Sequence, residues 1–114
     1  MDFVLLLTLI AGHYLADFGL QSQHMAAKKQ LIFLDPMGIH ALTSHAFIHA
    51  IIAGLLSGSI LAAAIIGSAH WLIDFGKASK WLHKKLGKEE GLYGIHVDQA
   101  LHIAVIFIVV VTVI

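Results

Sequence analysis

Four pairs of potential metal ligands occur along the chain, and the two members of each pair are always four residues apart. The pairs are His13 and Asp17, His45 and His49, His70 and Asp74, and Asp98 and His102. On an α-helix, residues i and i+4 lie on one face, so each pair presents two ligand-type side chains in the same direction. Imidazole nitrogens and carboxylate oxygens bind divalent ions such as zinc, iron, manganese and nickel. The spacing therefore predicts one metal site built by four helices.

The helices that must position these pairs are apolar. The chain has 114 residues, of which 59% are hydrophobic and only 12% are charged. Apolar stretches cover residues 3–18, 39–56, 60–76 and 97–114, and each approaches the roughly 17–25 residues of a transmembrane helix. A spanning segment must satisfy its own backbone polar groups, which favours helices even where Ile and Val are abundant. We therefore expect residues 1–114 to form a single all-α integral membrane domain, a four-helix transmembrane bundle.

The connections predict an up-down topology. Ser57-Gly58-Ser59 favours a tight helical hairpin between the second and third helices. The other two connections are longer and contain all seven lysines. By the positive-inside rule, both long loops face the cytoplasm and both termini lie outside. Within the second loop, Trp81, Leu82 and Leu86 alternate with lysines, which predicts an amphipathic helix lying in the membrane interface between helices three and four.

Depth in the bundle supports a common site. The pairs lie at the end of helix one, the start of helix two, the end of helix three and the start of helix four, which is one level in an up-down bundle. This level is close to the lysine-bearing loops. Ionisable groups inside a bilayer are costly and are normally paired or metal-bound. Eight candidates suit one or two divalent ions, with zinc favoured, although a polar layer that only joins the helices by hydrogen bonds is the alternative.

Composition excludes several classes. The chain has no cysteine, which excludes disulfides and thiolate metal sites. Its formal net charge is zero, so no basic field indicates a nucleic-acid partner. The first apolar stretch has neither a basic n-region nor a cleavage signature, so we expect no removable signal peptide. Self-association into a homo-oligomer stays open. The remaining histidines lie in loops or at helix ends, where a solvated imidazole needs no ligand role; they are His24, His40, His83 and His96.

A metal-dependent hydrolase is the function that this pattern favours. The bound ion would activate a water molecule, and Asp98 or Asp17 would serve as general base. Gln21 and Gln99 lie next to these carboxylates and are candidates for hydrogen bonds to a ligand or substrate. A lipid-linked or phosphorylated small molecule is the expected substrate class. A metal or proton transporter and a haem-binding electron-transfer protein are the alternatives.

The ordered motifs resemble a known family. They are G-H-x-L-A-D-F-x-L-Q from Gly12 to Gln21, H-x-x-x-H from His45 to His49, H-W-L-I-D-F-G-K from His70 to Lys77, and D-Q-A-L-H from Asp98 to His102. This set is similar to the bacterial and phage membrane proteins grouped as domain of unknown function 3307. The resemblance implies a protein of the bacterial inner membrane. More loosely, the His/Asp pattern is similar to that of membrane-bound proteins classed as metal-dependent hydrolases, which implies the same activity here.

Overall fold

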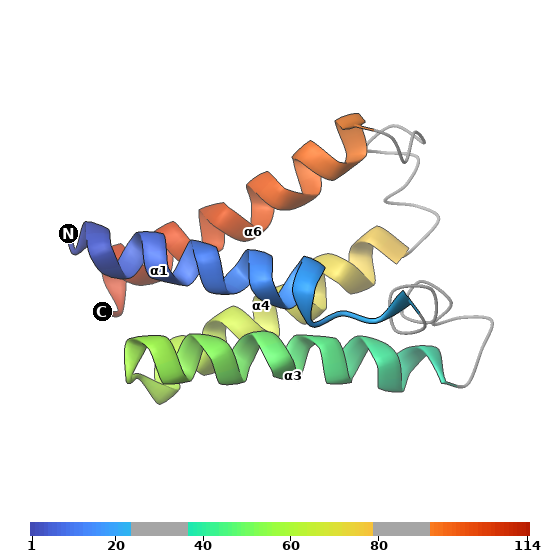
Figure 1. Ribbon diagram of the computed structural model, residues 1–114, viewed down its shortest axis with the longest axis horizontal. Coiled ribbons are helices and arrows are strands. Elements are labelled where there is room, and N and C mark those ends of the chain that lie inside the picture. The colour runs from blue at the N-terminus through green and yellow to red at the C-terminus, as the bar shows by residue number, and fades with distance from the viewer. Residues whose placement is uncertain (24–36, 79–91) are drawn as a thin grey trace.

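The computed structural model describes residues 1–23, 37–78 and 92–114, with side chains described for 1–23, 37–76 and 97–114. The elements are α1 (Phe3–Tyr14), a short π-helix η1 (Leu15–Gly19) that continues it, α3 (Gly38–Ser57), α4 (Ile60–Ala78) and α6 (Leu92–Thr112). Every element in these ranges is helical, which confirms the all-α prediction. Both termini lie at the same end of the molecule, which is also the end where α3 connects to α4 (Figure 1).

The helices pack in a ring. Among the described residues, α1 contacts α3 and α6, and α4 contacts the same two helices. Helices α1 and α4 therefore lie diagonally across the bundle, as do α3 and α6. One face of each helix points to the common axis, so side chains from all four helices can meet there.

The hairpin between α3 and α4 follows from three small residues. Gly58 closes α3 with φ 69°, in the left-handed region that glycine adopts at no steric cost, and its N–H donates to Gly54 O at 2.8 Å. Ser59 then caps α4 by accepting from the Ala62 N–H at 3.0 Å. Further along α4, a Cβ on Gly67 would lie only 2.7 Å from Ala50 Cβ, so glycine permits the close approach of these two helices.

The interior has two layers along the bundle axis. Toward the termini and the hairpin, buried aliphatic side chains form an apolar core that comprises Leu9, Ala53, Ala62, Ile66, Ile106, Val109 and Val110. On every helix the His/Asp pair lies on the other side of this core, nearer the two long connections. The apolar core therefore closes one end of the bundle, and the polar layer occupies the middle of the molecule.

The helix bounds differ from the expected ones where the long connections begin. Helix α4 continues to Ala78, and α6 begins at Leu92 instead of at residue 97. The rest of the expected interfacial helix lies outside the described residues. Within those residues, α3 is the one helix long and apolar enough to cross a membrane, whereas the apolar segments Phe3–Gly19, Ile60–Gly76 and Val97–Thr112 are shorter. Length and composition thus mark one candidate span.

Candidate metal centre

Asp17 is placed by a local change of helix type. Within η1 the Leu20 N–H donates to Leu15 O at 2.9 Å, a bond five residues back instead of four. Such single π-turns widen a helix locally and are frequent at functional sites. Gln21 supports the turn from outside, since its Nε2 donates to the backbone oxygen of Asp17 at 3.1 Å. The Asp17 side chain is buried against the other helices.

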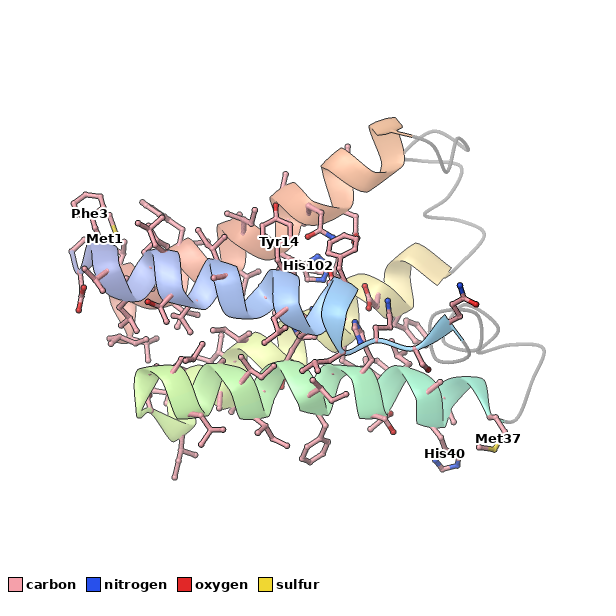
Figure 2. The ribbon with its side chains drawn as sticks, in the orientation of Figure 1. Met1, Phe3, Tyr14, Met37, His40 and His102 are labelled. Atoms are coloured by element: carbon pink, nitrogen blue, oxygen red, sulfur yellow. The ribbon has the colours of Figure 1, made fainter. Side chains whose placement is uncertain are left out.

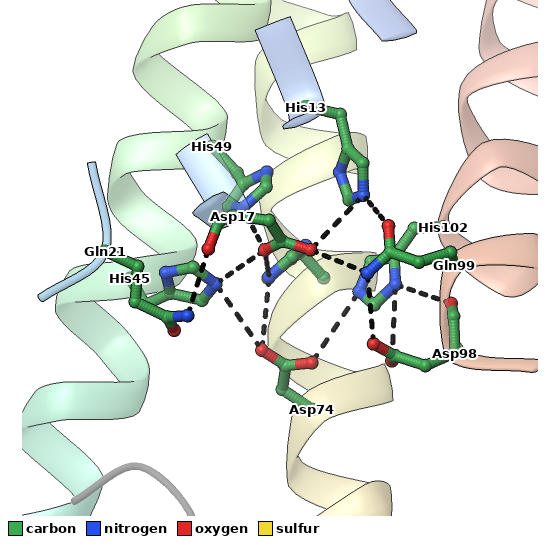
Figure 3. Close-up of polar contacts among 10 residues, drawn as sticks. His13, Asp17, Gln21, His45, His49, Asp74, Asp98, Gln99 and His102 are labelled. Atoms are coloured by element: carbon green, nitrogen blue, oxygen red, sulfur yellow. Dashed lines mark hydrogen bonds and ion pairs between the residues drawn. The ribbon is translucent and has the colours of Figure 1, made fainter. Parts of the chain in front are cut away.

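The Asp17 carboxylate is the centre of the polar layer (Figure 3). Nε2 of His45 and Nε2 of His49, both on α3, each donate to Asp17 Oδ1 at 3.0 Å. Nε2 of His70, on α4, lies 3.8 Å from the same oxygen. The rings of His49 and His70 stack with their centroids 3.6 Å apart. Two helices, α3 and α4, therefore direct three imidazole nitrogens toward a single carboxylate oxygen.

These four residues lie close enough together to hold one metal ion. Their donor atoms all lie within 4.8 Å of one another, and the three histidines are fully buried. Zinc binds imidazole nitrogen at about 2.0–2.1 Å, so the edges of a tetrahedral site measure about 3.3–3.4 Å. The distances to Asp17 Oδ1, from 3.0 to 3.8 Å, bracket that edge length. We call Asp17, His45, His49 and His70 the first group.

A second group of donors adjoins the first and comprises His70, Asp74 and His102. Asp74 Oδ2 lies 3.1 Å from His70 Nε2, and Asp74 Oδ1 lies 3.7 Å from His102 Nε2. Among the described residues, Nε2 of His70 and Nε2 of His102 are buried without a hydrogen-bond partner. A buried polar atom without a partner is costly, and metal ligation removes that cost.

Gln99, on α6, connects Asp17 with His13 through hydrogen bonds. Its Nε2 donates to Asp17 Oδ2 at 2.9 Å, and its Oε1 accepts from His13 Nε2 at 2.8 Å. Because an amide oxygen only accepts, the proton of His13 lies on Nε2 in this arrangement. His13 Nε2 also lies 3.4 Å from Asp17 Oδ2. Gln99 thus orients the central carboxylate from the side opposite the histidines of α3.

Asp98 lies at the edge of the layer, on α6. Its backbone oxygen accepts from His102 Nδ1 at 2.8 Å, and its Oδ2 accepts from Gln99 Nε2 at 3.3 Å. A carbonyl oxygen only accepts, so the proton of His102 lies on Nδ1, and a neutral ring carries its lone pair on Nε2. In a neutral ring, His102 Nε2 therefore carries the lone pair that can bind a metal ion.

All eight candidate ligands are buried in one connected layer. The structure brings six of them into the two groups, while His13 and Asp98 lie beside these groups. Among the described residues, Gln21 hydrogen-bonds to the backbone oxygen of Asp17, whereas Gln99 hydrogen-bonds to side chains of candidate ligands. Adjacency to Asp98 in sequence marked Gln99 as a candidate but did not indicate its bond to Asp17.

His40 is exposed on α3 and points away from the layer (Figure 2). The side chains of His24, His83 and His96 lie outside the described residues.

Comparison with known proteins identifies a family and no characterised relative. Residues 4–114 match the family model described as protein of unknown function (DUF3307). This match confirms the resemblance expected from the motifs. No curated protein and no solved structure matches.

Proposed function

The chain belongs to the DUF3307 family of proteins of unknown function, and we propose that it is a membrane-embedded metal protein that acts as a metal-dependent hydrolase. One divalent ion, with zinc favoured over manganese, iron or nickel, binds to the first group. The observation that carries this proposal is the convergence of Nε2 atoms of His45, His49 and His70 on Asp17 Oδ1, within 3.0–3.8 Å.

Metal binding explains the layer better than helix packing alone. A hydrogen-bonded joint between helices needs one or two His–Asp pairs, whereas this layer buries eight ionisable side chains. A packing joint would also satisfy the hydrogen-bonding groups of its members, yet Nε2 of His70 and Nε2 of His102 form no hydrogen bond among the described residues. Divalent ions bind such nitrogens and neutralise the buried carboxylates at the same time.

The distribution of apolar side chains supports the membrane part of the proposal. The outer face of the bundle carries large aliphatic side chains, such as Val4 at 76%, Leu55 at 80% and Ile60 at 90% exposure. The inside instead holds the His/Asp layer. Apolar outside and polar inside is the arrangement that a bilayer favours and water opposes. With the lysine-bearing connections on the cytoplasmic side, the metal layer faces the cytoplasmic half of the bacterial inner membrane.

Hydrolysis uses the residues around the ion. A divalent ion held by these residues that also took a water as a fifth ligand would polarise that water and would act as a Lewis acid for a phosphoryl or acyl oxygen. Asp17 belongs to the first group, so we assign it to metal ligation. Asp98 lies outside both groups and is the general base. The substrate class we propose is a phosphorylated or lipid-linked small molecule that enters from the side of the long connections.

Two alternative functions are less consistent with the geometry. A haem needs space between or beside its axial histidines, whereas the rings of His49 and His70 stack directly, and the cavity bordering His13 and His49 measures about 10 Å³. A transporter needs a polar path to both faces, whereas the apolar core packs beside the layer toward the termini. The apolar core favours a site that is reached from the side of the long connections.

The test has two stages. Protein purified in detergent should contain zinc or a related ion, and His49→Ala should lose it while the exposed-site control His40→Ala retains it. The holoprotein is then assayed on p-nitrophenyl phosphate and phosphatidic acid, and Asp98→Asn should lower turnover by about 10²-fold or more at unchanged metal content. A protein without metal contradicts the whole proposal. A metal-loaded protein without metal-dependent turnover of either substrate contradicts the hydrolase assignment.

A further inference from the structure

We propose that the layer holds two divalent ions, bridged by the Asp74 carboxylate. This inference rests on the proposed metal function and adds a second position to it. The first group would hold one ion, and Asp74 Oδ1 together with His102 Nε2 would begin the second position. Figure 3 shows Asp74 between His45 of α3 on one side and His102 of α6 on the other.

The two groups cannot both be complete metal sites, because they share one histidine. Both contain His70, and its Nε2 lone pair binds a single ion at a time. A carboxylate has two oxygens and can bind one ion with each. Asp74 Oδ2 lies 3.1 Å from His70 Nε2 and 3.7 Å from His45 Nε2, which places it beside the first group. Asp74 Oδ1 instead faces His102 Nε2 at 3.7 Å. Each oxygen of Asp74 therefore serves a different position.

The environment of His102 supplies independent support. Its Nδ1 donates to the Asp98 backbone oxygen, so a neutral ring directs the Nε2 lone pair toward a carboxylate oxygen. Two lone pairs that face each other in a buried site repel, and His102 is only 4% exposed. A cation between Nε2 and Asp74 Oδ1 turns this repulsion into two coordination bonds. The backbone bond at Nδ1 is also the usual outer support of a metal-bound imidazole.

Asp17 does not act as a second bridge, because its Oδ2 accepts a hydrogen bond from Gln99 Nε2 at 2.9 Å. Oδ1 faces the histidines of the first group, and Oδ2 lies 3.4 Å from His13 Nε2. Three buried carboxylates carry three negative charges, of which one divalent ion neutralises only two. Two ions about 3.5–4 Å apart, the spacing of two-metal hydrolytic centres, would more than neutralise these three charges, and Asp74 would supply one oxygen to each ion.

The experiment is a titration of the full chain, stripped with a chelator in detergent, with Co²⁺ alone. The wild-type protein should bind about two ions, His102→Ala about one, and the control His40→Ala about two. Saturation of the wild type at one ion would overturn the second position and leave the proposed function standing. No Co²⁺ binding at all would overturn both.

A spectroscopic measurement tests the bridge in the wild-type protein, with Asp74→Asn as the comparison. Wild-type protein loaded with two equivalents of Mn²⁺ should give the exchange-coupled electron paramagnetic resonance spectrum of a carboxylate-bridged pair. Asp74→Asn, which keeps the side-chain volume but leaves one oxygen, should lose that coupling. An uncoupled spectrum from the doubly loaded wild type would show that Asp74 does not bridge.

Discussion

Replacing Gln99 by leucine tests whether the central carboxylate is held in place for metal binding. Leucine is close in size but cannot form either hydrogen bond of the amide. The variant loses the 2.9 Å bond from Gln99 Nε2 to Asp17 Oδ2 and the 2.8 Å bond from His13 Nε2 to Gln99 Oε1. Asp17 then keeps its contacts with the histidines of α3 but gains freedom to rotate about its own side-chain bonds.

The expected loss of zinc affinity is about 10- to 100-fold, the usual effect of removing an outer partner of a metal ligand. The hydrogen bond to the Asp17 carboxylate gives a consistent figure. Hydrogen bonds to charged groups contribute about 1.5–3 kcal/mol, and each 1.4 kcal/mol corresponds to a factor of ten. The number of ions bound at saturation should not change, because Gln99 is not itself a ligand.

The assay is a competition titration of the purified protein against a chromophoric zinc chelator. Gln21→Leu is the matched control, since Gln21 Nε2 donates to the Asp17 backbone oxygen at 3.1 Å and to no side chain among the described residues. We expect its zinc affinity to stay within a few-fold of wild type. Wild-type affinity in Gln99→Leu, or an equal loss in Gln21→Leu, would refute the positioning role of Gln99.

Three further predictions concern acidity, topology and packing. Zinc affinity should fall as the pH is lowered from about 7.5 to 5.5, because protons compete with the ion for imidazole nitrogens; the same titration at several pH values measures this, and a flat profile would argue against histidine ligands. The chain lacks cysteine, so single substitutions report topology: in intact cells a membrane-impermeant maleimide should label Ser57→Cys but not Gln23→Cys, and the reverse pattern would invert our orientation. Gly67→Val should lower stability by about 1–3 kcal/mol through its clash with Ala50, seen as a lower melting temperature than that of the exposed control Ser68→Val; equal melting temperatures would contradict the close approach.

Sequence spacing determined the composition of the polar layer. An interval of four residues places two side chains on one helical face, so the pairs on residues 13–17, 45–49, 70–74 and 98–102 had to act together wherever their helices packed. The short hairpin at Ser57-Gly58-Ser59 and the position of each pair along its helix then set a common level. This reasoning needs only helix geometry and chain order, which are local properties.

The tertiary structure decided which pairs meet. Sequence spacing joins Asp17 to His13, yet the shortest contacts of the Asp17 carboxylate are with His45 and His49 of α3 and with Gln99 of α6. These contacts depend on the π-turn at Leu15–Gly19 and on how the ring of four helices is rotated. Neither leaves a periodic signal in the sequence, because helix rotation is set by packing across the bundle.

The division between sequence and structure has one physical cause. Periodicity along a helix fixes which side chains share a face, so the sequence alone determined the set of candidate ligands and their common level in the bundle. Distances between helices depend on the side chains at every contact, such as Gly67 against Ala50. Only the folded molecule could therefore decide that Asp17 lies among the histidines of two other helices and that Asp74 lies between His70 and His102.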